Sequence, residues 1–295
     1  MKKVLLVTDS IFFKKNFQYY LKKNSLNQKL IVKKPNSISS HYLKKNKLRN
    51  QLSFCVVNFG LSGGIQYNIK NGNKILEKNI EGYLHVLNCL KEARIKKIFF
   101  ISASCVYPKN LKILNTEDFA KKNIEKTSIH YAASKMIGTF FSLLVNKNKN
   151  YNWKTIIPAT LYGKYNSMDK NNAHVIGALC TKFKKSKKII TLWGSGNAKR
   201  EFLHILDFID AIFFIHKNKL KNEIINVGNG KDISIKNLAK IFINLTKFKG
   251  RIIWDTKKPE GAKRKLLNSN YLLSLGWKPK IKFNFGISEI IKANK

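Results

Sequence analysis

Tyr131 and Lys135 lie four residues apart, a separation that places both side chains on one face of a helix, one turn from each other. A hydride-transfer site has a use for this arrangement. The lysine ammonium lowers the pKa of the phenol and can hold a cofactor ribose, while the phenol exchanges a proton with a substrate oxygen. Because lysine is abundant in this chain, a solvated Tyr–Lys pair that matches by chance is the alternative.

Short apolar runs predict the sheet that would support this helix. Runs without polar alternation are typical of strands buried on both faces of a parallel sheet. They occur at 4–7, 30–32, 54–57, 98–101 and 155–157, and segments with apolar residues at helical spacing lie at about 11–23, 73–93 and 130–147. This repeated pattern predicts an α/β fold with a Rossmann-like, doubly wound parallel sheet over residues 1–160.

The pattern becomes irregular after Pro158. A helix near 174–185, the turn-rich segment 193–197 and a helix at about 233–245, capped by Asp232 or Ser234, are the clearest features. We therefore expect residues 161–295 to form a smaller C-terminal α/β substrate domain, partly interleaved with the first.

The place of Tyr131 and Lys135 in this pattern favours a functional role. The segment 101–108 ends the fourth apolar run, and the segment 157–163 ends the fifth, with the pair between them. Ligands bind at the carboxyl ends of the strands in open sheets, so both segments are expected to reach the same crevice as the pair.

The formal net charge of +41 would ordinarily suggest a nucleic-acid partner. Only five of the 57 basic residues are arginine, and the lysines are spread along the whole chain as pairs. An AT-rich coding sequence would produce this composition, so we interpret the charge as drift on solvated faces and expect neither a nucleic-acid nor a membrane partner. A selected polyanion-binding surface is the alternative.

Cys55, Cys89, Cys105 and Cys180 have no CxxC spacing, which predicts neither a metal site nor a disulfide framework. The apolar run at the N-terminus stops at Thr8, short of a signal peptide, and no stretch of 18 apolar residues occurs. We therefore expect a cytoplasmic protein.

Several segments together resemble the extended short-chain dehydrogenase/reductase superfamily and, within it, the GDP-L-fucose synthase family. The resemblance spans nearly the whole chain. It is found in SASCVYPK (102–109), YAASK (131–135), LYGKYNSMDKNNAHVIGAL (161–179), LWGSGNAKREFLH (192–204), INVGNG (225–230), KPEGAKRKLL (258–267) and the GGI of 63–65, which Asn79 follows in the next helix.

The resemblance implies an enzyme that epimerises a GDP-hexose, GDP-4-keto-6-deoxymannose, at C3 and C5 and then reduces it at C4 with NADPH. Tyr131 and Lys135 would serve the reduction, and Cys105 and His174 would be the acid/base pair of the epimerisation. A thiol and an imidazole suit that role because both titrate near neutral pH. The resemblance also implies a homodimer.

Ligand contacts follow from the same resemblance. The substrate would be bound by Lys182, Trp193, Arg200 and Glu260, with Arg264 and Lys265 as candidates for further phosphate contacts. The NADP(H) cofactor would be bound by Lys33, Lys34, Ser102, Ser104, Lys135, Pro158, Leu161 and His174. Lys33 and Lys34 follow the second apolar run where an acidic residue would favour NAD, so the sequence favours a 2′-phosphate.

Two departures from the family pattern leave alternatives open. Thr8, Ile11 and Lys14 replace the glycines of the GxxGxxG turn that lets a pyrophosphate approach the backbone. Ala103 stands where the family has a serine that hydrogen-bonds the reacting oxygen. A noncatalytic homologue that binds a sugar nucleotide, or an epimerase without reductase activity, would also fit, and the choice depends on whether Phe12 and Phe13 fill the cofactor groove or the core.

Overall fold

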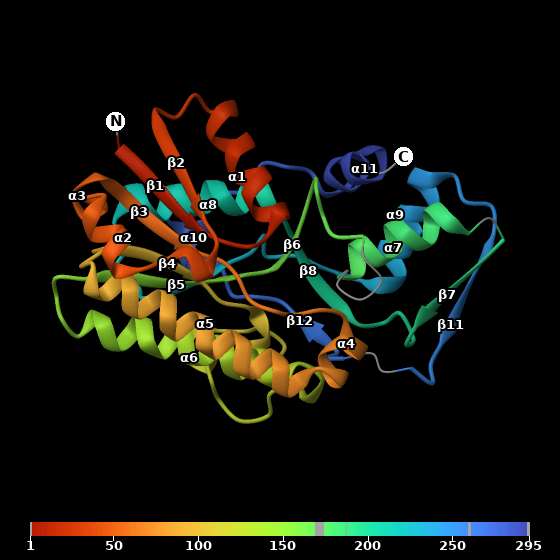
Figure 1. Ribbon diagram of the computed structural model, residues 1–295. Helices are drawn as coiled ribbons and strands as arrows, with labels where there is room; N and C mark the ends of the chain where they lie inside the picture. The colour runs from red at the N-terminus through yellow and green to blue at the C-terminus, as the bar shows by residue number, and fades with distance from the viewer. Residues whose placement is uncertain (1, 169–173, 187, 259–260, 294–295) are drawn as a thin grey trace.

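The structure is a computed structural model that describes residues 2–168, 174–186, 188–258 and 261–293. Two lobes lie side by side (Figure 1). The first lobe contains a parallel sheet covered by helices on both faces, and the second contains the smaller sheets together with α7, α9 and α11. The predicted α/β class is confirmed.

The first lobe is organised around a six-stranded sheet in the order β2-β1-β3-β4-β5-β9, in which every strand pair is parallel. Alternate residues of β1 face the two sides: Val4 and Leu6 belong to one buried core, and Leu5 and Val7 to the other. This burial on both faces explains the runs without polar alternation. The strands are β1 (Lys2–Val7), β2 (Gln28–Lys33), β3 (Leu52–Val57), β4 (Lys97–Ile101), β5 (Asn152–Pro158) and β9 (Ile224–Val227).

Two pairs of long helices cover this sheet. α1 (Ile11–Lys23) packs beside α8 (Ile205–Asn218), and α5 (Gly72–Glu92) packs beside α6 (Ile129–Asn146) (Figure 1). The three helices predicted here are confirmed within two residues at each end. Shorter helices complete the lobe: η1 (Pro35–Ser37), α2 (Ser40–Lys45), α3 (Leu48–Gln51), α4 (Ile65–Lys70), η2 (Ser104–Val106), η3 (Thr116–Asp118), η4 (Lys126–Ser128) and α10 (Asn270–Ser274).

The boundary predicted at residue 160 divides the chain too simply. After its first excursion into the second lobe, the chain returns through α8 and β9, and β9 pairs with β5 as the sixth strand of the first sheet. Phe208 and Ile212 of α8 are fully buried in the same core as Phe13 and Phe17 of α1. The segment of about residues 205–227 therefore packs with the first lobe.

The second lobe contains two small sheets. β8 (Lys199–His204) pairs with β6 (Thr160–Tyr162), β10 (Asp232–Ser234) and β12 (Arg264–Lys265), and β7 (Ile189–Trp193) pairs with β11 (Arg251–Asp255). Its helices are α7 (Val175–Lys185), α9 (Ile235–Thr246) and α11 (Phe283–Ala293). Ser234 caps α9 by accepting a hydrogen bond from the backbone of Asn237, which decides between the two predicted caps. Within the described ranges, no helix is long and apolar enough to cross a membrane.

Candidate active site

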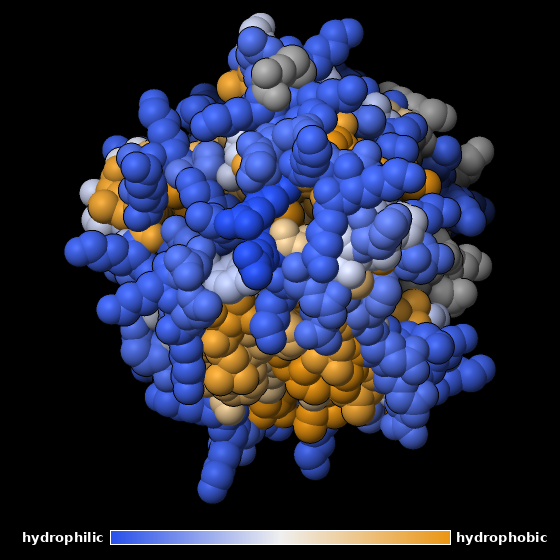
Figure 2. Space-filling view, turned by 60° about the vertical axis from the view of Figure 1, so that its left-hand side comes forward, coloured by the Kyte–Doolittle hydropathy of each residue, from blue (hydrophilic) through white to orange (hydrophobic). Residues whose placement is uncertain are grey.

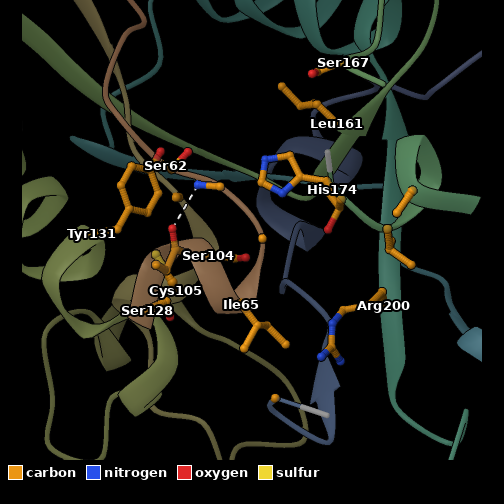
Figure 3. A pocket seen from close by; sticks show the side chains of 18 of the residues that line it. Ser62, Ile65, Ser104, Cys105, Ser128, Tyr131, Leu161, Ser167, His174 and Arg200 are labelled. Carbon is orange, nitrogen blue, oxygen red and sulfur yellow. Dashed lines mark hydrogen bonds between the residues drawn. The ribbon is translucent and has the colours of Figure 1, made fainter. Parts of the chain in front are cut away.

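A cavity of about 790 Å³ lies where the carboxyl ends of β1, β3, β4 and β5 meet the second lobe. Its lining runs from Asp9 and Ser10, after β1, to Arg200 in β8 and Lys265 in β12. Tyr131 lies on one side of the cavity, and His174 and Arg200 lie on the other (Figure 3). As expected for an open parallel sheet, the strand ends form one crevice.

Lys135 is held at the ends of two strands. Its side chain is 1% exposed, and its Nζ donates hydrogen bonds to the carbonyl oxygens of Phe59, at 3.1 Å, and Ile101, at 2.7 Å. Burial lowers the pKa of the ammonium to about 7. The ammonium lies 5.7 Å from the centre of the Tyr131 ring, so the two side chains share one helix face as predicted.

Tyr131 forms part of the cavity wall beside Lys135. Burial raises the pKa of its phenol well above the usual value, and the thiol of Cys105 acts in the same direction. The hydroxyl of Ser62 opposes this rise in the pKa of the phenol. In the structure the phenol therefore carries its proton and can act as an acid.

Cys105 and His174 approach the cavity from different lobes. Cys105 lies in η2 and is 6% exposed, and burial raises the pKa of its thiol although Lys265 acts to lower it. His174 precedes α7, with its ring exposed to the cavity, and the surrounding protein and the Lys265 ammonium lower its pKa. Both groups are thus neutral near pH 7, one able to donate a proton and the other to accept one.

Cationic side chains from the second lobe converge on the same cavity. Arg200 and Lys265 are register partners in the parallel pair β8–β12, and both line the cavity. Lys182 and Trp193 also line it, and the Lys182 Nζ donates to the carbonyl oxygen of Thr191. This grouping suits a diphosphate, which Arg200 can bind through two parallel hydrogen bonds.

One of the expected phosphate contacts falls elsewhere. Arg264, the neighbour of Lys265, is paired with Asp232 and does not line the cavity. Glu260 lies outside the described residues. Sequence spacing could not separate Arg264 from Lys265, because adjacent residues of a strand point to opposite faces.

The predicted cofactor contacts Ser102, Ser104, Pro158 and Leu161 all line the cavity. Ser102 is 3% exposed, and its hydroxyl has no hydrogen-bond partner within the described part of the chain. A buried hydroxyl without a partner is costly, which makes Ser102 an exception among the buried polar groups of this site.

The two neighbouring lysines after β2 have different surroundings. Lys34 lines an adjoining hollow of about 470 Å³ that shares Asp9, Phe59 and Gly60 with the main cavity. The Lys33 ammonium instead lies 4.2 Å from the centre of the Tyr42 ring and does not belong to either lining. The structure thus brings Lys34 to the candidate cofactor site but not Lys33.

The turn between β1 and α1 folds without the family glycines. The Ser10 side chain caps α1 by accepting from the backbone N–H of Phe13 at 3.2 Å, and the Thr8 hydroxyl accepts from the N–H of Ser10 at 3.1 Å. Two N–H groups that could bind a pyrophosphate are therefore already used by the chain itself. Ile11 is 66% exposed, so its side chain is directed outward.

Phe13 belongs to the core rather than to the groove. It is 1% exposed, and its ring centre lies 6.2 Å from that of Phe17 and 6.0 Å from that of Phe208. Phe12 is partly buried against the same core, and both residues line the cavity without closing it. The residues present therefore fit a dinucleotide, with a weaker hold on its pyrophosphate than a glycine-rich turn would give.

Comparison with known proteins places this site in context. Residues 26–228 match the model of the NAD dependent epimerase/dehydratase family. GDP-L-colitose synthase of Yersinia pseudotuberculosis is 33% identical over 86% of this chain and 87% of its own, and GDP-L-fucose synthase of Sinorhizobium fredii is 34% identical over 77% and 74%. A GDP-mannoheptose C4 reductase from Campylobacter jejuni, solved with NADP bound, superposes with a TM-score of 0.85 at 23% identity, covering 99% of this chain and 98% of that one.

Proposed function

The chain belongs to the NAD dependent epimerase/dehydratase family, in the group that contains the GDP-L-fucose synthases, and we propose that it is an NADP-dependent GDP-sugar epimerase/reductase. Its substrate would be GDP-4-keto-6-deoxymannose. The main support is that one cavity gathers Tyr131, Cys105, His174 and Arg200 from both lobes. A neutral thiol, a neutral imidazole, a protonated phenol and a diphosphate-binding cation are the groups that this chemistry needs.

The epimerisation uses the neutral forms of two side chains. The imidazole of His174 accepts a proton from the carbon next to the keto group, and the Cys105 thiol donates one. Arg200 and Lys265 bind the diphosphate, which keeps the hexose between these two groups.

The reduction uses Tyr131 as its acid. NADPH, when bound, supplies the hydride. Tyr131 donates its proton to the C4 oxygen, while the buried Lys135 orients the cofactor end of the site and stabilises the negative charge that develops on the phenol.

Titration of the purified protein with NADPH, followed by nicotinamide fluorescence, tests the reductase assignment. We expect saturable binding below about 1 mM, in the ordinary range of enzyme ligands. NADPH should bind more tightly than NADH, because the Lys34 ammonium can contact the 2′-phosphate. Lys34→Ala should weaken NADPH binding about fivefold, the effect of an exposed charge contact near 1 kcal/mol.

Lys33→Ala is the matched control for this titration. Its ammonium lies over Tyr42 and outside both linings, so the preference for NADPH should persist in this variant. Failure of the wild-type protein to bind NADPH at millimolar concentration would refute the reductase assignment and favour a noncatalytic homologue.

We further propose a homodimer formed through α5 and α6. Figure 2 shows hydrophobic residues gathered over the lower part of one face, where these two helices lie. On these two helices, Leu84, Phe140 and Leu144 are 37%, 47% and 60% exposed. An apolar patch of this kind on adjacent helices suits a self-complementary interface.

Leu144→Glu is expected to convert this dimer to a monomer, because a carboxylate would be buried against the apolar face of the second chain. Light scattering after size exclusion should then give the mass of one chain, 34.0 kDa. Phe285→Glu, which changes a 64% exposed side chain of α11, should leave the dimer intact. A wild-type protein that is monomeric at micromolar concentration would contradict the assignment.

We assign the protein to the cytoplasm as part of the same proposal. Cys55, Cys89, Cys105 and Cys180 are all free thiols. Such thiols are typical of a reducing compartment, and the proposed role of Cys105 requires one.

A further inference from the structure

We propose that Ser62 supplies the hydroxyl that is missing at Ala103, so that in the reduction it lies beside the Tyr131 phenol and donates a hydrogen bond to the reacting carbonyl oxygen. This inference rests on the proposed reductase function. It assigns a catalytic role to a residue in the loop after β3, whereas the family serine lies in the loop after β4.

The Ser62 side chain lies next to Tyr131. It lies on the same side of the cavity as Tyr131 and close to that ring (Figure 3). It lines the cavity, is half-buried, and acts to lower the pKa of the phenol beside it. A ligand oxygen that reaches the phenol therefore also comes within reach of this hydroxyl.

The loop that carries Ser62 is fixed on both sides. The side-chain amide of Asn79 accepts from the N–H of Leu61 at 2.6 Å and donates to its carbonyl oxygen at 3.0 Å. On the other side, the N–H of Gly63 donates to the Asn68 side chain at 2.9 Å. A hydroxyl held in this way needs little reorganisation during the reaction, which is the property of an effective oxyanion donor.

The serines beside Ala103 are placed less well for this role. Ser102 is buried and its hydroxyl has no partner among the described residues, so it does not reach the phenol. Ser104 lines the cavity, but Ser62 is the serine that lies beside the Tyr131 ring (Figure 3). The hydroxyl that is absent at Ala103 is therefore replaced by one in the loop after β3, and not by a serine next to Ala103 in the sequence.

In the reduction with Ser62 in place, one hydride and one proton are transferred to the carbonyl group. The carbonyl carbon receives a hydride from NADPH, which leaves as NADP⁺, and the carbonyl oxygen receives the phenol proton, so that C=O becomes CH–OH. The Ser62 hydroxyl donates a hydrogen bond to the oxygen as its negative charge develops and keeps its own proton. The phenolate of Tyr131 then regains a proton from solvent.

Steady-state kinetics of serine variants tests this role. Ser62→Ala is expected to lower kcat for C4 reduction by roughly 10²-fold, the effect of losing one oxyanion donor, with little change in KM. Ser128→Ala removes another cavity-lining hydroxyl, which is bonded to the carbonyl oxygen of Glu125, and should retain wild-type kcat. Adding Ala103→Ser to Ser62→Ala should restore most of the lost rate, because it returns a hydroxyl to the family position.

The outcomes separate cleanly. Wild-type kcat in Ser62→Ala, or no recovery on adding Ala103→Ser, overturns the role of Ser62. If Ser62→Ala does not fold, Ser62→Cys keeps the size of the side chain but donates weakly, and it should show the same loss of kcat. If the wild-type protein binds NADPH but reduces no GDP-4-keto-6-deoxymannose, the proposed function itself fails, and this inference falls with it.

Discussion

Tyr131→Phe is expected to abolish C4 reduction, with a fall in kcat of about 10²–10⁴-fold, the usual contribution of a positioned acid. The phenol is the protonated group of the cavity, because burial raises its pKa, and phenylalanine has no proton to donate. NADPH should still bind, since the ring remains and Lys135 is unchanged. Stopped-flow measurement of NADPH oxidation, together with the fluorescence titration, checks both expectations.

Tyr107→Phe is the matched control for this change. Tyr107 is 2% exposed, and its hydroxyl donates to Asn226 at 2.7 Å, away from the cavity. Its loss should cost about 1 kcal/mol of stability and leave kcat unchanged. Near wild-type reduction in Tyr131→Phe would show that another group supplies the proton.

Cys105→Ser is expected to remove the epimerisation while sparing the reduction. A serine hydroxyl is a far weaker acid than a thiol, so proton transfer to carbon should slow by about 10²-fold or more. In D₂O, deuterium incorporation at C3 and C5 of the sugar should fall accordingly, whereas NADPH oxidation by the unepimerised keto-sugar continues. NMR of the recovered sugar measures the incorporation.

Cys89→Ser serves as the control because this half-buried thiol lies against the carbonyl oxygen of Ile38 and does not line the cavity. In the wild-type protein, exchange should also fall at acid pH, since a protonated imidazole accepts no proton. Because the pKa of His174 is lowered, this loss should occur below the ordinary histidine range. Unchanged exchange in Cys105→Ser would show that its assigned role is wrong.

The sequence predicted the central strands well because their burial pattern is simple. β1 and β3 to β5 have apolar residues on both faces, and this pattern needs no knowledge of distant contacts. β9 escaped prediction because it has four residues and depends on pairing with β5, about 70 residues earlier. The return of α8 to the first lobe likewise depends on tertiary packing against α1.

The sequence also predicted most of the residues of the candidate site, but not Ser62. Tyr131, Cys105, His174, Lys182, Trp193 and Arg200 all reach one cavity, as the family resemblance implied. Ser62 was missed because its proximity to Tyr131 brings together a loop and a helix that are separated by about 70 residues. Its one signal in sequence is a hydroxyl before the paired glycines Gly63 and Gly64, close to the end of an apolar run.

The return of the chain through α8 and β9 makes the two lobes a single folding unit. A fragment ending at residue 160 would leave the edge of β5 unpaired and would remove Phe208 from its contact with Phe13. Exposed strand edges and uncovered aromatic rings promote aggregation. The first lobe therefore cannot be replaced as a domain by dividing the chain at one position. Replacing it would also require the segment that returns from the second lobe, so the cofactor-binding and substrate-binding parts of the chain cannot be exchanged independently.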